Sequence, residues 1–178
     1  MSAPRAALAE PVSEADHSSG PAAAAITLVE YGDYECPYCG EAFAIVRELQ
    51  RAFGDALRFV FRNFPLAEIH PHAEQAAEMA EATALQGRFW EMYAVLYENQ
   101  RDLSDSALLR YAAQAGADVQ QALAAIAAGA PRRRVERDLQ SGSRSGVQGT
   151  PSFFVNGARY DGPWDYERLA AHLKLLVV

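Results

Sequence analysis

The apolar positions of the chain follow two different spacings, which separate expected strands from expected helices. Residues 26–31 form a nearly continuous apolar run in which Glu30 is the one charged exception, and such a run is typical of a strand buried on both faces. From Pro37 to residue 53 the apolar residues recur at helical spacing until Gly54 ends the pattern, and proline suits the first position of a helix. A second apolar run at 57–61 predicts a second strand.

The middle of the chain is rich in alanine, leucine and glutamine, and this composition predicts four or five helices. Glycine, proline and serine separate the helical segments. The expected helices span residues 72–85, 89–97, 104–115, 119–128 and 132–139. They lie in a block from 66 to 146, several times longer than the roughly dozen residues that one crossover between parallel strands needs. We therefore expect an inserted helical subdomain.

After residue 146 the apolar spacing returns to that of strands. Residues 152–155 and 158–160 predict two strands joined by the turn Asn156-Gly157, a strong signal for a two-residue hairpin. A closing helix is expected at 165–176. The expected organisation is a flexible N-terminal arm at 1–24, an α/β domain formed by 25–65 and 147–178, and the helical subdomain at 66–146.

Composition and charge narrow the class of protein. Of the 178 residues, 50% are apolar and 22% are charged, which is typical of soluble globular domains rather than of disordered chains. The formal net charge of −7 argues against a nucleic-acid-binding surface. No apolar run approaches the roughly 18 residues of a membrane-spanning helix, so neither nucleic acid nor a membrane is expected as a partner.

The first residues bear on the expected location. A secretory signal needs a basic start followed by about 7–15 apolar residues, whereas only 6–9 are apolar between Arg5 and Glu10. We therefore expect a cytoplasmic protein. A signal segment preceding this sequence would instead indicate a periplasmic or other extracytoplasmic location.

Cys36 and Cys39 are the only cysteines, too few and too close for the disulfide framework of a secreted mini-protein. Two cysteines three residues apart at the start of a helix share one face and lie close enough to form a disulfide or to share a metal. Cys36, at the positive end of the helix dipole, is expected to be the reactive thiolate, and Cys39, one turn further, its buried partner. The preceding strand and Pro37 favour redox chemistry, so no metal is expected.

Three motifs in this order resemble the DsbA-like branch of the thioredoxin-fold dithiol oxidoreductases. They are VEYGDYECPYC at 29–39, FRNFPL at 61–66 and GTPSFFVNG at 149–157. The resemblance covers roughly residues 21–176. More specifically, the chain resembles the bacterial DsbA-like proteins that occur alone or fused behind sodium/proton antiporters. It implies an α/β thioredoxin fold with a helical insertion between the second and third strands.

The resemblance also implies roles for residues outside the cysteine pair. Pro151 would be a cis-proline facing the disulfide, with Thr150 offering its backbone to an extended substrate strand. Pro37 and Tyr38, between the cysteines, would join them in binding substrate. Tyr38 stands where the strongly oxidising DsbA pattern has histidine, and a neutral side chain gives the Cys36 thiolate no cationic support. We therefore expect a less oxidising dithiol, toward the range of glutaredoxins and disulfide isomerases.

Glu30 is the third candidate catalytic residue. An unpaired carboxylate on a strand buried on both faces is costly and calls for a reason. The resemblance implies that Glu30 passes protons to and from the buried cysteine. The open alternative is a structural acid at the strand end that reaches water or pairs with Arg58 or Arg62.

The expected function is thiol–disulfide exchange through Cys36 and Cys39 with protein or low-molecular-weight thiol substrates. Its direction (oxidase, reductase or isomerase) stays open. A recycling redox partner is expected and no cofactor beyond the redox-active disulfide, with a low-molecular-weight thiol as a candidate reductant. The alternative is a non-enzymatic peptide-binding or chaperone module whose disulfide is regulatory.

Overall fold

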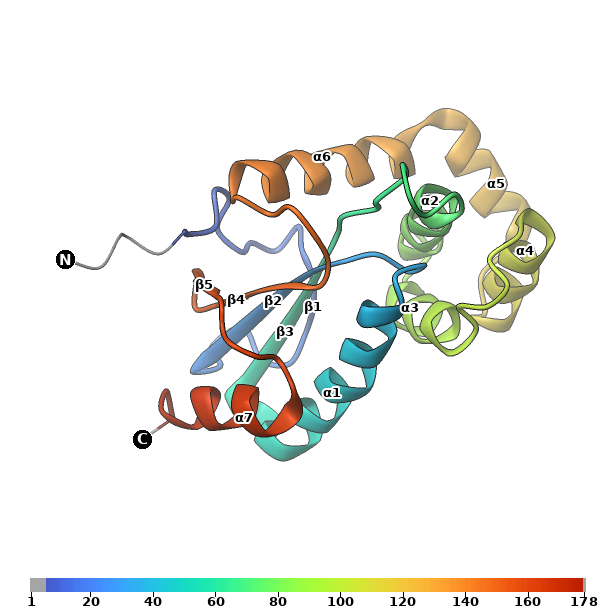
Figure 1. The fold of residues 1–178 in the computed structure, drawn as a ribbon. Coiled ribbons are helices and arrows are strands. Elements are labelled where there is room, and N and C mark those ends of the chain that lie inside the picture. Colours follow the sequence, from blue (N-terminus) through green and yellow to red (C-terminus); the bar gives the residue numbers. More distant parts are fainter. Residues whose placement is uncertain (1–5, 178) are drawn as a thin grey trace.

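The computed structural model describes residues 6–177, and its framework is a five-stranded mixed sheet (Figure 1). The strands lie in the order β1-β3-β2-β4-β5, with β2 and β3 parallel at the centre and the other neighbours antiparallel. Their bounds are β1 His17–Ser19, β2 Ile26–Gly32, β3 Leu57–Asn63, β4 Ser152–Val155 and β5 Ala158–Tyr160. The helical insertion separates β3 from β4, which are the second and third of the four strands expected from the sequence.

Helices cover both faces of this sheet. The helices α1 Pro37–Phe53 and α7 Tyr166–Lys174 pack on one face, and α6 Ala130–Arg144 crosses the other (Figure 1). Side chains alternate along β2, so Leu28 belongs to the larger apolar cluster with α1, whereas Val29 and Tyr31 belong to a smaller cluster on the α6 side. By the same alternation, Glu30 lies on the α1 face of the sheet.

The sequence of α1 accounts for both of its ends. Pro37 occupies the first turn, where no backbone donor is needed. Gly54 ends the helix with a φ of 48°, a conformation that favours glycine. The buried side chains of α1 recur at helical spacing and include Cys39, Phe43 and Val46. The helix thus carries Cys39 on its buried face and leaves Cys36 at its N-terminus.

The other helices of the insertion group beyond one end of the sheet (Figure 1). They are α2 Ala73–Ala84, α3 Phe89–Glu98, α4 Asp105–Gln114 and α5 Val119–Ala128. All of them, and α6, fall between residues 66 and 146. Within residues 6–177, no helix has both the length and the apolar character that crossing a membrane requires.

The helix α6 runs five residues beyond the segment that the sequence predicts to end at 139. Ser141 and Gly142 have low helix propensity, but tertiary contacts hold them in the helix. The Ser141 hydroxyl lies 2.7 Å from that of Tyr31. A Cβ at Gly142 would lie 2.7 Å from the Phe64 ring, so only glycine lets α6 approach the sheet this closely. Packing against the sheet therefore overrides local preference.

The N-terminal segment differs from the flexible arm expected at 1–24. Residues 1–5 lie outside the described residues, but 17–19 form β1 and pair with β3 along the sheet edge. Arg62 on β3 binds Asp16 through two hydrogen bonds of 2.9 and 3.0 Å, and its guanidinium also donates to the Glu10 carbonyl at 3.0 Å. Because these contacts join polar residues, the apolar pattern gave no sign of them.

Candidate active site

Cys36 and Cys39 lie at the N-terminal turn of α1, and both are free thiols. Cys36 is the N-cap residue, with extended backbone angles of −71° and 122°, and its exposed fraction is 4%. Cys39 has an exposed fraction of 0% and receives a hydrogen bond from the backbone N–H of Asp33 at 3.5 Å. Both thiols are therefore buried, and Cys36, at the end of the helix, is the less completely enclosed of the two.

The surroundings of Cys36 favour its thiolate. Interaction with the Cys39 thiol contributes most to lowering the pKa of Cys36 from 9.0 to about 5, and the nearby Thr150 side chain and the backbone N–H groups of Cys39 and Tyr38 lower it further. These effects outweigh burial, which opposes them. The Thr150 hydroxyl is buried without a hydrogen-bond partner among residues 6–177, so it is available to the sulfur. The N-terminus of a helix adds its own preference for negative charge.

Cys39 has the opposite character. Burial raises the pKa of Cys39 most, and its hydrogen bond to Cys36 and the nearby charge of Glu30 raise it further. Cys39 therefore stays protonated while Cys36 ionises. The two neighbouring sulfurs therefore differ in ionisation, with Cys36 favoured as a thiolate and Cys39 kept as a thiol.

The loop before β4 faces the cysteines. The Thr150–Pro151 peptide bond is cis, and the Cys36 sulfur lies 3.6 Å from the Thr150 carbonyl oxygen. The structure thus brings residues that are 114 positions apart in the chain to one point. Pro37 and Tyr38 lie at the surface beside them, and the side chain of Tyr38 is 61% exposed. A molecule approaching Cys36 would meet all four of these residues.

Glu30 lies within the core close to the cysteines. Its exposed fraction is 0%, and neither carboxylate oxygen has a hydrogen-bond partner within residues 6–177. Burial, followed by the charge of Cys36, raises the pKa of Glu30 from 4.5 to about 8. Arg62 binds Asp16 instead, and Arg58 donates to Ser18 at 3.3 Å. The alternative in which Glu30 reaches water or pairs with either arginine is therefore wrong.

Three buried tyrosines surround this acid and Cys39. Tyr34, Tyr93 and Tyr97 pack against one another, with ring centroids 5.0 to 6.3 Å apart. Their hydroxyls have no hydrogen-bond partner in the described part of the chain, and burial, followed by nearby acids or by Cys39, raises the pKa of each. The sequence shows Tyr93 and Tyr97 only as part of an aromatic stripe on a helix. The charge of Glu30 contributes to raising each of these pKa values, so the three tyrosines lie near this acid in the core.

Two acidic residues anchor the segment that precedes Cys36. Asp33 accepts hydrogen bonds from His70 at 2.7 Å and from the backbone N–H of Leu66 at 2.9 Å. Glu35 accepts one from the backbone N–H of His72 at 2.7 Å. No local pattern indicates these pairs, because they join positions 33 to 37 residues apart. They hold the loop after β3 against the cysteine motif.

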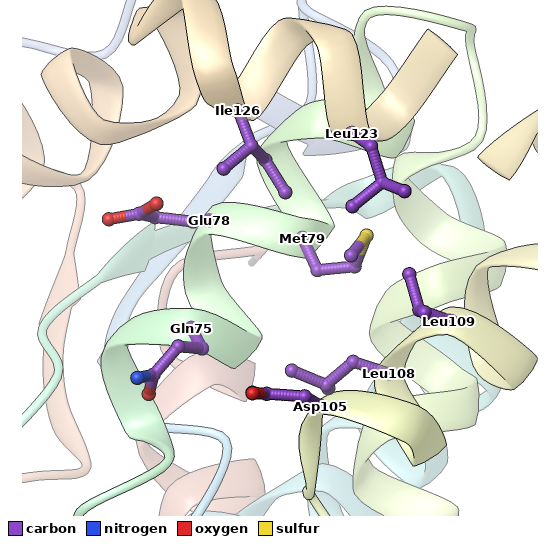
Figure 2. A pocket seen from close by; sticks show the side chains of 8 residues that line it. All are labelled: Gln75, Glu78, Met79, Asp105, Leu108, Leu109, Leu123 and Ile126. Carbon is purple, nitrogen blue, oxygen red and sulfur yellow. The ribbon is translucent and has the colours of Figure 1, made fainter. Parts of the chain in front are cut away.

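Two cavities lie outside the cysteine motif, and neither is lined by a cysteine. One of about 400 Å³ borders the 64–69 loop and Gln148, two residues before Thr150. Another of about 260 Å³ lies between α2, α4 and α5, where Figure 2 shows Met79, Leu108 and Ile126 pointing into a largely apolar space. None of the residues that line the second cavity belongs to the cysteine motif or to the loop at 150–151. Among residues 6–177, no group of three or more metal-ligating side chains is placed to hold a metal.

The thioredoxin family profile matches residues 12–174, and the chain belongs to this family. It is similar to a thioredoxin-like oxidoreductase from Silicibacter pomeroyi, with 26% identity, a TM-score of 0.81 and 92% of each chain covered. The fold is also that of BdbD from Bacillus subtilis, with a TM-score of 0.85 over 97% of this chain and 98% of that chain, at 22% identity. The expected DsbA-like thioredoxin fold with a helical insertion is confirmed. This fold and the neighbouring cysteines support a thiol–disulfide oxidoreductase.

The curated relatives are proteins named as sodium/proton antiporters. A stretch of 156 residues is 45% identical to NhaA 3 of Salinispora tropica and covers 88% of this chain. A stretch of 161 residues is 43% identical to NhaA of Herminiimonas arsenicoxydans and covers 90% of this chain. The chain spans about a quarter of the length of these relatives, 24% and 25% respectively. The similarity therefore concerns one part of each antiporter.

Proposed function

We propose that the protein exchanges disulfides with protein or low-molecular-weight thiol substrates through Cys36 and Cys39. The observation that carries this proposal is the difference between the two thiols. The pKa of Cys36 is lowered to about 5, whereas the pKa of Cys39 is raised by burial. A thiolate attacks a disulfide much faster than a thiol does, so the pair has one sulfur ready to react at neutral pH.

In the reducing direction, the Cys36 thiolate attacks one sulfur of a substrate disulfide. The substrate S–S bond breaks, its other sulfur leaves as a thiolate, and a mixed disulfide joins Cys36 to the substrate. Cys39 then loses its proton and attacks the Cys36 sulfur, which releases the second substrate thiolate and leaves a Cys36–Cys39 disulfide. In this direction a reducing partner or a low-molecular-weight thiol then reduces the Cys36–Cys39 disulfide back to the dithiol. The oxidising direction is the reverse of these steps, and an oxidising redox partner then restores the Cys36–Cys39 disulfide.

Glu30 and the Thr150–Pro151 segment take the supporting roles in this proposal. Glu30 accepts the proton of Cys39 when Cys39 attacks, and a pKa of about 8 suits exchange of that proton near neutral pH. The Thr150 backbone binds an extended substrate strand beside Cys36, together with Pro37 and Tyr38. No cofactor beyond the dithiol takes part in these steps.

The test uses a peptide that contains one disulfide and the Cys39→Ser protein, which forms the mixed disulfide but cannot resolve it. Mass spectrometry should detect one peptide bound to Cys36, while the Cys36→Ser protein should bind none and should not turn over. Turnover by Cys36→Ser, or no adduct on Cys39→Ser, would overturn the proposal. Retained binding of unfolded peptides by both variants, without turnover in the native protein, would favour the chaperone alternative.

A further inference from the structure

Gln100 lies in the segment between α3 and α4 and reaches the cysteine motif from the helical insertion. Its side-chain amide donates to the carbonyl of Tyr34 at 2.8 Å and to that of Cys36 at 2.9 Å. The contact spans 64 residues of sequence to Cys36. It is a direct hydrogen bond from the insertion to the backbone of the nucleophilic residue.

The segment that carries Gln100 has its own anchors. Asn99 donates from its side chain to the carbonyl of Val95 at 2.8 Å, and the Tyr111 hydroxyl donates to the carbonyl of Asp102 at 2.8 Å. These bonds fix the segment to α3 and α4 whether or not Gln100 touches the cysteine motif. The position of the segment that carries Gln100 therefore does not depend on the hydrogen bonds of the Gln100 amide.

The carbonyl of Cys36 belongs to the backbone hydrogen bonds that fix the start of α1. It accepts the first hydrogen bond of α1, from the backbone N–H of Gly40 at 3.2 Å, while the N–H of Cys36 donates to Asp33 at 3.2 Å. The amide of Gln100 is the further donor on that carbonyl. The backbone of Cys36 is thus held on both sides, which sets the direction of its side chain.

Gly40 provides the space that the amide occupies. A Cβ at Gly40 would lie 2.1 Å from the side-chain oxygen of Gln100 and 2.9 Å from its amide carbon. Glycine inside a helix is unfavourable relative to alanine, so its presence at the first turn of α1 needs a reason. The Gln100 amide supplies one, because any larger residue at position 40 would push it away.

We propose that Gln100 is a positioning residue, by which the helical insertion orients Cys36 and supports its thiolate, and that Gly40 leaves the space for it. The inference rests on the proposed thiol–disulfide exchange and adds a residue to it. The two donated hydrogen bonds offset the partial negative charge of the Tyr34 and Cys36 carbonyl oxygens, at the N-terminal end of α1 that carries the Cys36 side chain. Without them that charge is uncompensated at the residue that bears the sulfur, so its thiolate becomes less favourable.

The experiment measures the rate of alkylation of Cys36 by iodoacetamide against pH, with the modified residue identified by mass spectrometry. Gln100→Ala should move the midpoint upward, and a shift of one pH unit would make alkylation at pH 4 about tenfold slower. Gln100→Glu should move it further, because it replaces the donor with a negative charge. Gln86→Ala is the matched control, since Gln86 also bonds backbone groups within the insertion, on Asp118, away from the cysteines.

Gly40→Ala disrupts the same hydrogen bonds of Gln100 through a change in α1. It should reproduce the effect of Gln100→Ala by displacing the amide, and it leaves Gln100 itself in place. In the double variant the two effects should not add, because Gly40→Ala has nothing left to displace. A profile for Gln100→Ala equal to that of Gln86→Ala, or additive effects in the double variant, would overturn the proposal.

This experiment needs no substrate, so its outcome is separate from that of the proposed function. If the Cys39→Ser protein formed no mixed disulfide, the proposed thiol–disulfide exchange would be wrong even if Gln100→Ala shifted the alkylation midpoint. If Gln100→Ala left the alkylation midpoint unchanged, the proposed positioning role of Gln100 would be wrong even if the mixed disulfide formed. A loss of thermal stability common to Gln100→Ala and Gln86→Ala, with unchanged alkylation in both, would show that Gln100 only supports the fold.

Discussion

The Cys36 sulfur lies 3.6 Å from the carbonyl oxygen of Thr150, although 114 residues separate them along the chain. The entire helical insertion lies between these two positions in sequence. The sheet brings them together, because β2 leads into the cysteine motif and β4, its antiparallel neighbour, begins directly after the loop at 150–151. The site therefore depends on the pairing of β2 with β4.

Thr150→Val tests whether the threonine hydroxyl supports the thiolate. Valine has nearly the same shape but cannot donate to the sulfur, so the pKa of Cys36 should rise by about one unit or less, in keeping with the loss of one hydrogen bond. Alkylation against pH measures the change. Thr83→Val is the control, since Thr83 is also buried and its hydroxyl bonds the carbonyl of Ala80 within α2. Equal midpoints in the two variants would show that the hydroxyl of Thr150 has no such role.

Glu30→Gln should stabilise the fold and slow the reaction. The pKa of Glu30 is raised from 4.5 to about 8, so the unfolded chain releases this proton first and stability falls as pH rises between those values. At pH 7 the variant should gain on the order of 3 kcal/mol in free energy of unfolding. At pH 4 this gain should vanish, which urea unfolding at both pH values will show.

The kinetic effect of Glu30→Gln concerns the second step. Glutamine cannot accept the proton of Cys39, so release of the mixed disulfide should slow about a hundredfold or more. Formation of the mixed disulfide should change little, because Cys36 is already ionised at neutral pH. Unaltered release, measured by rapid acid quenching, would exclude Glu30 from proton transfer.

Elements set by local pattern could be predicted from the sequence, and elements set by distant contacts could not. The segments 119–128, 152–155 and 158–160 match α5, β4 and β5 to the residue, because each is bounded by glycine, proline or the Asn156-Gly157 turn. The strand β1 has only three residues, HSS, without apolar periodicity, and it exists through its pairing with β3. Its register is a tertiary property that no local pattern encodes.

The residues of the site also fall into those that the sequence predicts and those that it does not. Cys36, Pro37 and Cys39 are adjacent in sequence, and the chemistry of a cysteine pair at a helix start can be read from the spacing. His70 and Gln100 carry no motif, and they reach the cysteine motif only through the folding of the insertion. The sequence therefore predicts the reacting groups better than the residues that hold them in place.

Asp16→Asn tests whether the N-terminal segment is part of the fold. Asp16 and Arg62 form a largely buried ion pair. Burial opposes ionisation of Asp16, but hydrogen bonds, chiefly to Arg62, and the Arg62 charge outweigh it and lower the pKa of Asp16. Removing the charge leaves the guanidinium without its carboxylate, which should cost about 3 kcal/mol in free energy of unfolding by urea. Asp55→Asn, on an exposed turn, is the control. A loss below about 0.5 kcal/mol would mean that residues 10–19 detach from β3 in solution.

We propose Cys36 as the nucleophile of a dithiol whose two thiols ionise at very different pH. The rate of Cys36 alkylation against pH, measured on the reduced protein with mass spectrometry to identify the modified residue, tests it most directly. We expect a single midpoint near pH 5, since the pKa of Cys36 is lowered to about 5, and no modification of Cys39 over the same range. A midpoint of about 8 or above, close to that of an ordinary thiol, or faster modification of Cys39, would contradict it.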